Sequence, residues 1–423
     1  MVFVVVILRF PLMGIAIIVA STPIVELLPQ VSFISSALIP IGGITLFALI
    51  LYERHRSTAR WSVSSLEVIA VLYILWVFFS NPSASFYGND RSWILTFAQL
   101  LLLMWMARRF VRSEEDHQLI MLIVTLGILL SAIVAVQEVG LGIGLVQRAA
   151  GLSEGANTAA RYFVYGIILL SYLQSRLYDQ PVKRFLTLAG IVLLTLASIT
   201  TGSRSGFLLL GLSFFFLTQR FLVGRQRSIT LWLTLGMGFF WVLTQASGTI
   251  LDPAHILDAV LSGSDTVGAR YDFWRAGLAM WLDHPIAGIG IGRFRNYLLP
   301  YWQSYRPIIA WTPHNTYVQV LSETGAVGFI LFMTLLSTVL INFRSGIKIL
   351  PKNLSDIQWT WSIVLIVLLV GSMTKTDLLD KFFWFLMGIS VNTYDSQQGA
   401  VDAVFRRDVG QAYVERQDEN YRK

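Results

Sequence analysis

Arg204 stands in the sequence TTGSRSG at residues 200–206, where two glycines and two serines surround it. A guanidinium beside hydroxyl groups suits phosphate, because its planar fork of N–H donors can bind two oxygens at once. The alternative is an interfacial arginine whose side chain reaches lipid headgroups. We therefore treat Arg204 as a candidate phosphate-binding residue.

His314 stands in the sequence TPHNTYVQVLSETGAVG at residues 312–328, just before an apolar segment. A neutral imidazole in this position can take a proton from a hydroxyl group near neutral pH. The alternative is a histidine that caps the helix or contacts headgroups. The chain has no cysteine and no H-x-x-H or H-E-x-x-H pair, so we expect no disulfide, no thiol nucleophile and no metal site.

The sequence GIGIG at residues 288–292 has the composition of a nucleotide-binding loop but not its context. It does not follow a strand or open a G-x-G-x-x-G turn into a helix. We interpret it as a flexible turn, with close approach of its backbone to a lipid diphosphate as the alternative.

The composition of the chain indicates which kind of secondary structure carries these motifs. Of the 423 residues, 55% are hydrophobic and only 13% are charged, about half the charged share of a soluble domain. This excludes a disordered chain, a collagen-like fibre and a soluble multidomain enzyme, and it predicts an all-α polytopic membrane protein. About twelve apolar segments are long enough to span a bilayer: 2–20, 31–52, 63–80, 92–107, 118–138, 159–177, 182–200, 205–222, 228–246, 316–342, 357–374 and 382–393.

Basic residues predict the orientation of these spans. With the N-terminus inside, each of the five inner connections carries three Arg or Lys residues, whereas each short outer connection carries at most two. This distribution obeys the positive-inside rule and places both termini in the cytoplasm. It also accounts for most of the net charge of +7, so we expect no nucleic-acid partner.

One outer connection, residues 247–315, is much longer than the others. It holds five Arg and three of the five His residues, and its segment 268–283 has the spacing of an interfacial helix that His284 and Pro285 would end. We predict one transmembrane domain over residues 1–393 with this periplasmic loop inserted, followed by a polar cytoplasmic tail over 394–423. The remaining outer arginines favour a site at the outer interface for a ligand with a polar head and a lipid tail.

Three motifs in this order resemble the O-antigen ligase and polymerase family: TGSRSG after a span, then GARYDFWR with DHPIAGIGIGRF, and then PHNTYVQVLSETGAVG. The sequence GANTAARY at residues 155–162 is similar to an Asn-x-x-Ala stretch of that family. The resemblance implies a GT-C-like membrane glycosyltransferase in the bacterial inner membrane, active on the periplasmic face. Its donor would be a glycan on undecaprenyl diphosphate, with no cofactor and no metal.

The resemblance also implies roles for individual residues. Arg204 and Arg270 would hold the diphosphate, and His314 would activate the acceptor hydroxyl for an inverting displacement. The further contacts that it suggests are Arg275, Asn157 and Arg161.

Several functions remain open from the sequence. A ligase would transfer the glycan to a glycolipid acceptor such as lipid A-core, and we favour it because only one outer loop is large. A polymerase would extend lipid-linked repeat units with the same donor chemistry. A transporter of lipid-linked sugars would need polar residues through the bilayer, which the apolar helix centres do not supply. A scaffold protein would leave the outer arginines and histidines without a use.

Overall fold

The computed structural model describes residues 7–27, 35–56, 63–80, 90–141, 148–177, 179–221, 266–304, 308 and 312–391. These residues form helices and connecting turns, with no strand among them. The helices are α2 (Pro11–Ala20), η1 (Val25–Leu27), α3 (Ser35–Arg56), α4 (Ser65–Phe79), α5 (Asp90–Phe110), α6 (Glu114–Gly140), α8 (Ala156–Ser175), α9 (Pro181–Thr200), α10 (Arg204–Phe221), α13 (Thr266–Asp283), α14 (Phe294–Tyr301), α15 (Thr316–Ile349), α16 (Lys352–Gly371) and a last helix, Lys381–Val391.

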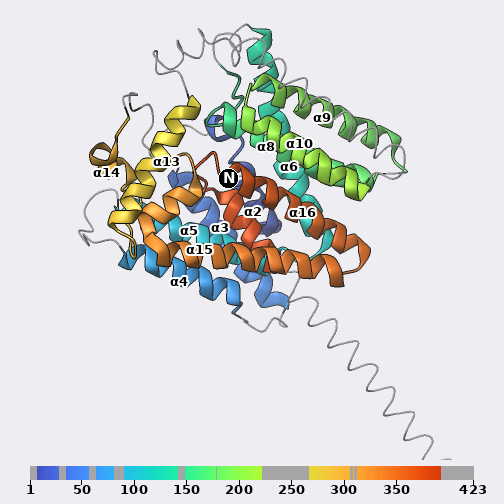
Figure 1. The fold of residues 1–423 in the computed structure, drawn as a ribbon. Helices are drawn as coiled ribbons and strands as arrows, with labels where there is room; N and C mark the ends of the chain where they lie inside the picture. The colour runs from blue at the N-terminus through green and yellow to red at the C-terminus, as the bar shows by residue number, and fades with distance from the viewer. Residues whose placement is uncertain are drawn as a thin grey trace, which may run out of the picture.

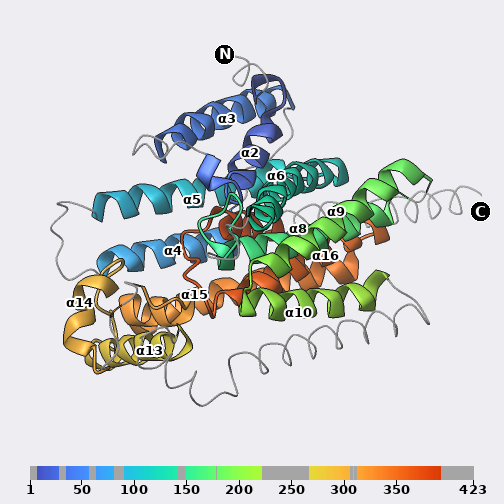
Figure 2. The same cartoon turned by 90° about the horizontal axis from the view of Figure 1, so that it is seen from above.

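The long helices lie lengthwise beside one another, with α13 and α14 at the end of the bundle where α15 begins (Figures 1 and 2). Helix α8 lies in the middle and packs against α6, α9, α10 and α16. Its residues from Thr158 to Leu170 are all buried. The last helix is equally buried, so the two apolar segments form the centre of the core.

The predicted spans agree with the observed helices in most places. Among the described residues, α6, α9, α15 and α16 are long and apolar enough to cross a membrane, and four apolar helices are shorter. The span predicted at 228–246 and the tail from 394 lie outside the described residues. The count of twelve spans and the GT-C-like arrangement therefore stay predictions.

Two predicted spans are interrupted. Helix α2 begins only at Pro11, after the non-helical residue Phe10, because proline lacks the N–H that a continuous helix over 2–20 would need. The span predicted at 316–342 lies within α15, where Gly325 has φ 67° and ψ −171° and breaks the helix. Such a backbone conformation is open to glycine and strained for other residues.

The GIGIG turn packs against the backbone of α15 at the point where Gly325 breaks the helix. The N–H groups of Ile289 and Gly290 donate to the carbonyls of Ser322 and Glu323, at 3.0 and 2.9 Å, and Ala326 N–H donates to the Pro285 carbonyl at 2.8 Å. A Cβ atom at Gly288 would lie 2.5 Å from the Glu323 backbone, so only glycine allows this approach. The turn is therefore a packed junction between the outer loop and α15, rather than the flexible segment that we expected.

Helix α13 matches the predicted interfacial helix closely. It covers Thr266–Asp283 and ends directly before His284 and Pro285, as the sequence predicts. It packs against the first part of α15 and against α14, which places Arg270 near the beginning of α15.

Candidate functional site

The turn before α10 presents Arg204 at one end of the bundle. Gly202 has φ 56°, which lets α9 and α10 meet in a tight turn. Ser203 is buried and its hydroxyl accepts from the Gly206 N–H at 3.1 Å, so it caps the start of the helix. Arg204 itself is exposed. Gly206 lies within α10, where a Cβ would clash with Ala160 of α8.

Asn157 and Arg148 hold this turn from the side of α8. Asn157 Oδ1 accepts from the Ser203 hydroxyl at 2.9 Å and from Arg148 Nη2 at 2.8 Å. Arg148 Nε donates to the Thr201 carbonyl at 2.9 Å. Asn157 therefore positions the Arg204 turn. Arg148 was not among our candidates, although it is the one basic residue in the predicted outer connection 139–158.

Arg270 reaches the same place from α13. Burial, and after it the positive charge of Arg204, lower the pKa of the half-buried Arg270 guanidinium. Partial burial and then the charges of Arg270 and Arg204 likewise lower the pKa of Arg148. Three arginines from three separate segments thus repel one another at one site. In the described part of the chain, none of the three forms an ion pair with a carboxylate.

His314 lies beside this arginine cluster in a constrained backbone. Its φ is 48°, the one positive φ of a non-glycine residue in the described segments. Trp274 Nε1 of α13 donates to the Pro313 carbonyl at 3.0 Å, and the cap of α15 is Asn315, not His314. Burial, followed by the charges of Arg270 and Lys375, lowers the pKa of the imidazole from its ordinary value. This shift favours the neutral imidazole, which can accept a proton.

Lys375 comes from the connection between α16 and the last helix. Its Nζ donates to Thr158 Oγ1 at 2.8 Å and forms a longer contact with Glu154 at 3.5 Å. Its carbonyl accepts from the Thr316 hydroxyl at 2.9 Å, which ties this connection to the start of α15. The structure places the charge of Lys375 near His314.

Two further candidates lie apart from the arginine cluster. Arg161 is 3% exposed and forms a bidentate ion pair with Asp377 at 2.9 and 2.7 Å. Its guanidinium also contacts the Tyr165 hydroxyl, so this geometry supports a positioning role instead of direct contact with a ligand. Arg275 is exposed and lines a separate hollow between α13 and the residues that follow α14.

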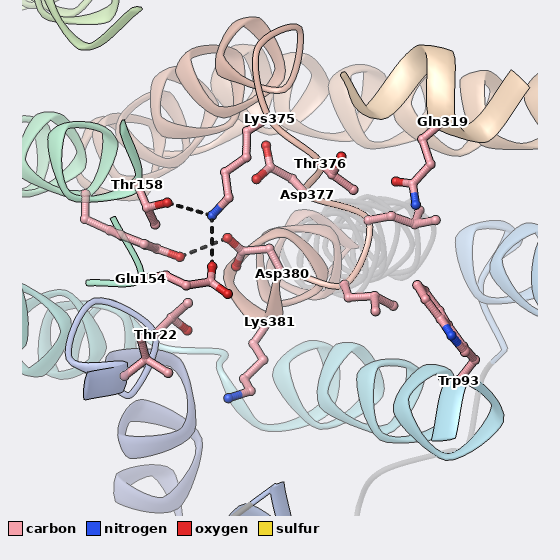
Figure 3. A pocket seen from close by; sticks show the side chains of 14 residues that line it. Thr22, Trp93, Glu154, Thr158, Gln319, Lys375, Thr376, Asp377, Asp380 and Lys381 are labelled. Atoms are coloured by element: carbon pink, nitrogen blue, oxygen red, sulfur yellow. Dashed lines mark hydrogen bonds and ion pairs between the residues drawn. The ribbon is translucent and has the colours of Figure 1, made fainter. Parts of the chain in front are cut away.

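A pocket of about 280 Å³ adjoins the site on the side of Lys375 (Figure 3). Its walls come from the start of α8, the 375–381 segment, Gln319 of α15 and Trp93 of α5. Within the described residues, no group of three or more His, Asp and Glu side chains is arranged to hold a metal ion. The arrangement can bind an anion at the arginines and accept a proton at His314.

Comparison with known proteins identifies part of the chain. Residues 189–333 match the family model described as O-Antigen ligase. This segment belongs to the O-antigen ligase family. The O-antigen ligase segment contains Arg204, Arg270 and His314, whereas Arg148, Asn157 and Lys375 lie outside it. No curated protein matches the chain in sequence. The match confirms the resemblance seen in the motifs and, at a coarse level, a membrane protein of the glycosyl-transfer type.

Proposed function

We propose that this protein is a glycosyltransferase of the bacterial inner membrane, with both termini in the cytoplasm. It transfers a glycan from undecaprenyl diphosphate to a hydroxyl acceptor at the periplasmic face. The observation that carries the proposal is the meeting of Arg148, Arg204 and Arg270 beside His314. Cations that no described carboxylate neutralises suit a ligand that brings its own negative charge, and a diphosphate does so.

The reaction is a single displacement. The acceptor oxygen attacks the anomeric carbon, the bond from that carbon to the phosphate oxygen breaks, and the electron pair leaves with the diphosphate. His314 takes the acceptor proton, and the configuration at the anomeric carbon inverts. Negative charge grows on the leaving phosphate, and guanidinium groups already aimed at it stabilise that charge without reorganisation. The proposed step uses no metal and no cofactor.

The proposed acceptor is a glycolipid, with lipid A-core the first choice, which makes the protein an O-antigen ligase. A polymerase would use the same donor and the same three arginines, and would differ only in taking another lipid-linked oligosaccharide as acceptor. The motifs of the matched segment serve both reactions, so the nature of the acceptor has to be measured.

The test is glycan transfer in proteoliposomes that contain the purified protein and a lipid-linked glycan extracted from a strain that makes it. Lipid A-core and a second lipid-linked glycan are offered separately as acceptors. Transfer to lipid A-core supports the ligase, and elongation of the lipid-linked glycan supports the polymerase. In the active reaction, His314→Ala lowers kcat by about 10²–10⁴-fold, the usual contribution of a general base. Turnover near that of the wild type would remove His314 from the mechanism.

A further inference from the structure

Glu323 is a buried carboxylate of α15, two residues before the break at Gly325, and it is 1% exposed. Its Oε1 accepts from the Phe294 N–H at 3.1 Å, and its Oε2 accepts from Gln319 Nε2 at 3.1 Å. The Gly292 N–H also hydrogen-bonds to this carboxylate. Burial of a carboxylate is costly unless donors surround it. Two of the three donors come from outside α15, so Glu323 joins α15 to the beginning of α14.

The backbone at the break is joined to the same region. The Glu323 carbonyl accepts from the Gly290 N–H at 2.9 Å. Trp76 Nε1 of α4 donates to the next carbonyl, that of Thr324, at 2.9 Å. Glu323 therefore binds the segment between α13 and α14 through both its side chain and its backbone, at a point that α4 holds from another side.

Helix α13 runs in the same direction as the first part of α15, and the two are in contact along their length. Trp274 Nε1 donates to the Pro313 carbonyl at 3.0 Å. One turn later, a Cβ atom at Gly277 would lie 2.5 Å from Val318 Cγ1. The 285–290 segment that follows α13 then hydrogen-bonds at the break. Helix α13 is thus attached to α15 near His314 at one end and near Glu323 at the other.

Phe294 connects the Glu323 carboxylate to α13. Its N–H binds the carboxylate, and its ring is buried in the apolar cluster that also contains Ala269 and Phe273 of α13. Ala269 directly precedes Arg270, and Phe273 lies three residues after it. The residue that Glu323 holds therefore packs beneath the part of α13 that carries Arg270.

The position of Arg270 matters because its charge acts on both His314 and Arg148. Misplacing a catalytic group by about 1 Å can cost about 10²-fold in rate. We propose that Glu323 is a positioning residue that holds α13 on α15 and thereby keeps Arg270 aimed at the substrate diphosphate beside His314. This inference rests on the proposed function, in which Arg270 stabilises the leaving phosphate.

The proposed role depends on the length and the acceptor oxygens of the Glu323 side chain. A glutamine in its place would keep one oxygen for the Phe294 N–H. Its amide nitrogen could donate to Gln319 Oε1, which is buried and makes no hydrogen bond with the described residues. Glutamine can therefore replace Glu323, whereas the shorter aspartate cannot reach both partners.

The first test compares three variants in the transfer assay. Glu323→Gln keeps the length and removes the ionisable group, Glu323→Asp keeps the carboxylate, and Glu323→Met fills the space without an acceptor. Glu323→Asp and Glu323→Met should lower kcat by about 10- to 100-fold, as expected for a misplaced catalytic group. Glu323→Gln should keep most of the wild-type kcat. An active Glu323→Asp with an inactive Glu323→Gln would overturn the inference, because charge would then matter more than position.

A double-mutant cycle tests whether Glu323 acts through Arg270. In the Arg270→Gln background, Glu323→Met should lower kcat little further, because the group that it positions is already absent. Losses that multiply would overturn the inference. Glu67→Met is the matched control, since Glu67 is a buried carboxylate of α4 that pairs with Arg108 of α5. It should lower the thermal midpoint and keep the wild-type kcat, whereas a loss of kcat equal to that of Glu323→Met would mean that instability explains both.

A distance measurement separates this inference from the proposed function. The chain has no cysteine, so Tyr271→Cys in α13 and Ile341→Cys in α15 can carry two spin labels without background. Both positions are exposed. Pulsed EPR in detergent, without substrate, should show a shifted or broader distance distribution in Glu323→Asp and Glu323→Met and an unchanged one in Glu323→Gln. This result supports the inference even if the wild type transfers no glycan, and identical distributions in all four proteins contradict it.

Discussion

Helix α10 begins at Arg204 and carries Arg220 in its last turn, and these two arginines lie in opposite surroundings. Arg220 forms an ion pair with Asp356 of α16 at 2.6 Å. Arg176, at the same end, lies 3.8 Å from both Glu114 and Asp356. Arg204 lies instead beside Arg270 and Arg148, with no ion pair to a carboxylate in the described part of the chain.

Arginines therefore have different roles at the two ends of α10. At the Arg220 end, the carboxylates of neighbouring helices neutralise the arginines, so these pairs connect helices and leave little charge for a ligand. At the Arg204 end, mutual repulsion of the three guanidinium groups is a cost in the free protein. A bound anion would relieve that cost.

Neutralising an arginine at the Arg204 end should have the largest effect. In the transfer assay, Arg204→Gln and Arg270→Gln are each expected to lower kcat by about 10²–10³-fold, the loss typical of one group that stabilises developing negative charge. The thermal midpoint should stay the same or rise, because a repulsive charge has been removed. Arg204→Lys keeps the charge and loses the bidentate fork, and full activity in this variant would exclude bidentate binding of the diphosphate there.

Substitutions in the buried ion pair of Arg161 and Asp377 test whether a buried arginine has a structural role. Asp377→Ala leaves the Arg161 charge buried without a partner and should destabilise the protein by about 3–5 kcal/mol. A thermal melt in detergent measures this loss. The double variant Arg161→Met with Asp377→Ala should recover most of it, and no recovery would mean that Asp377 acts through other contacts.

Lys375 should control how the reaction depends on pH. Burial, Arg270 and Lys375 lower the pKa of His314, so the neutral base persists to a more acidic pH than for a free histidine. Lys375→Met removes one of these charges and raises that pKa. The acidic limb of kcat/KM should therefore move to higher pH. Lys375→Arg keeps the charge and should keep the limb in place, whereas identical profiles for all three proteins would show that Lys375 does not act on His314.

The smallest effect is expected at the Arg220 end. Arg220→Gln breaks a partly exposed ion pair, which is worth only about 0–1 kcal/mol. Its transfer rate should match that of the wild type in the same assay that reports the loss in Arg204→Gln. A loss of activity comparable to that of Arg204→Gln would remove the contrast between the two ends.

Sequence patterns predicted much of the fold because apolar length and charge spacing act locally. A run of about twenty apolar residues must form a helix to satisfy its backbone in a membrane. Helix α13 and its end at His284 followed from side-chain spacing and from proline. The break in α15 could not be predicted from local sequence, because contacts with the 285–290 segment stabilise the conformation of Gly325.

The candidate site was predictable to the extent that its residues stand in motifs. Arg204, Arg270 and His314 were identified in this way, and the structure brings them together. Arg148 and Lys375 stand outside these motifs, and only the structure shows their hydrogen bonds to Asn157, Thr201 and Thr158.

The sequence alone predicted an all-α chain with helices long and apolar enough to cross a membrane, and it placed arginines and a histidine in motifs, because residue type and local period suffice for that. Only the tertiary structure decided which arginines pair with a carboxylate among the described residues. Arg161 and Asp377 are 216 residues apart and meet across the core, whereas Arg204 lies beside Arg270 and pairs with no carboxylate of the described residues. Ion pairing depends on the distance between two side chains in space, and a local sequence pattern does not give that distance for residues that are far apart in the chain.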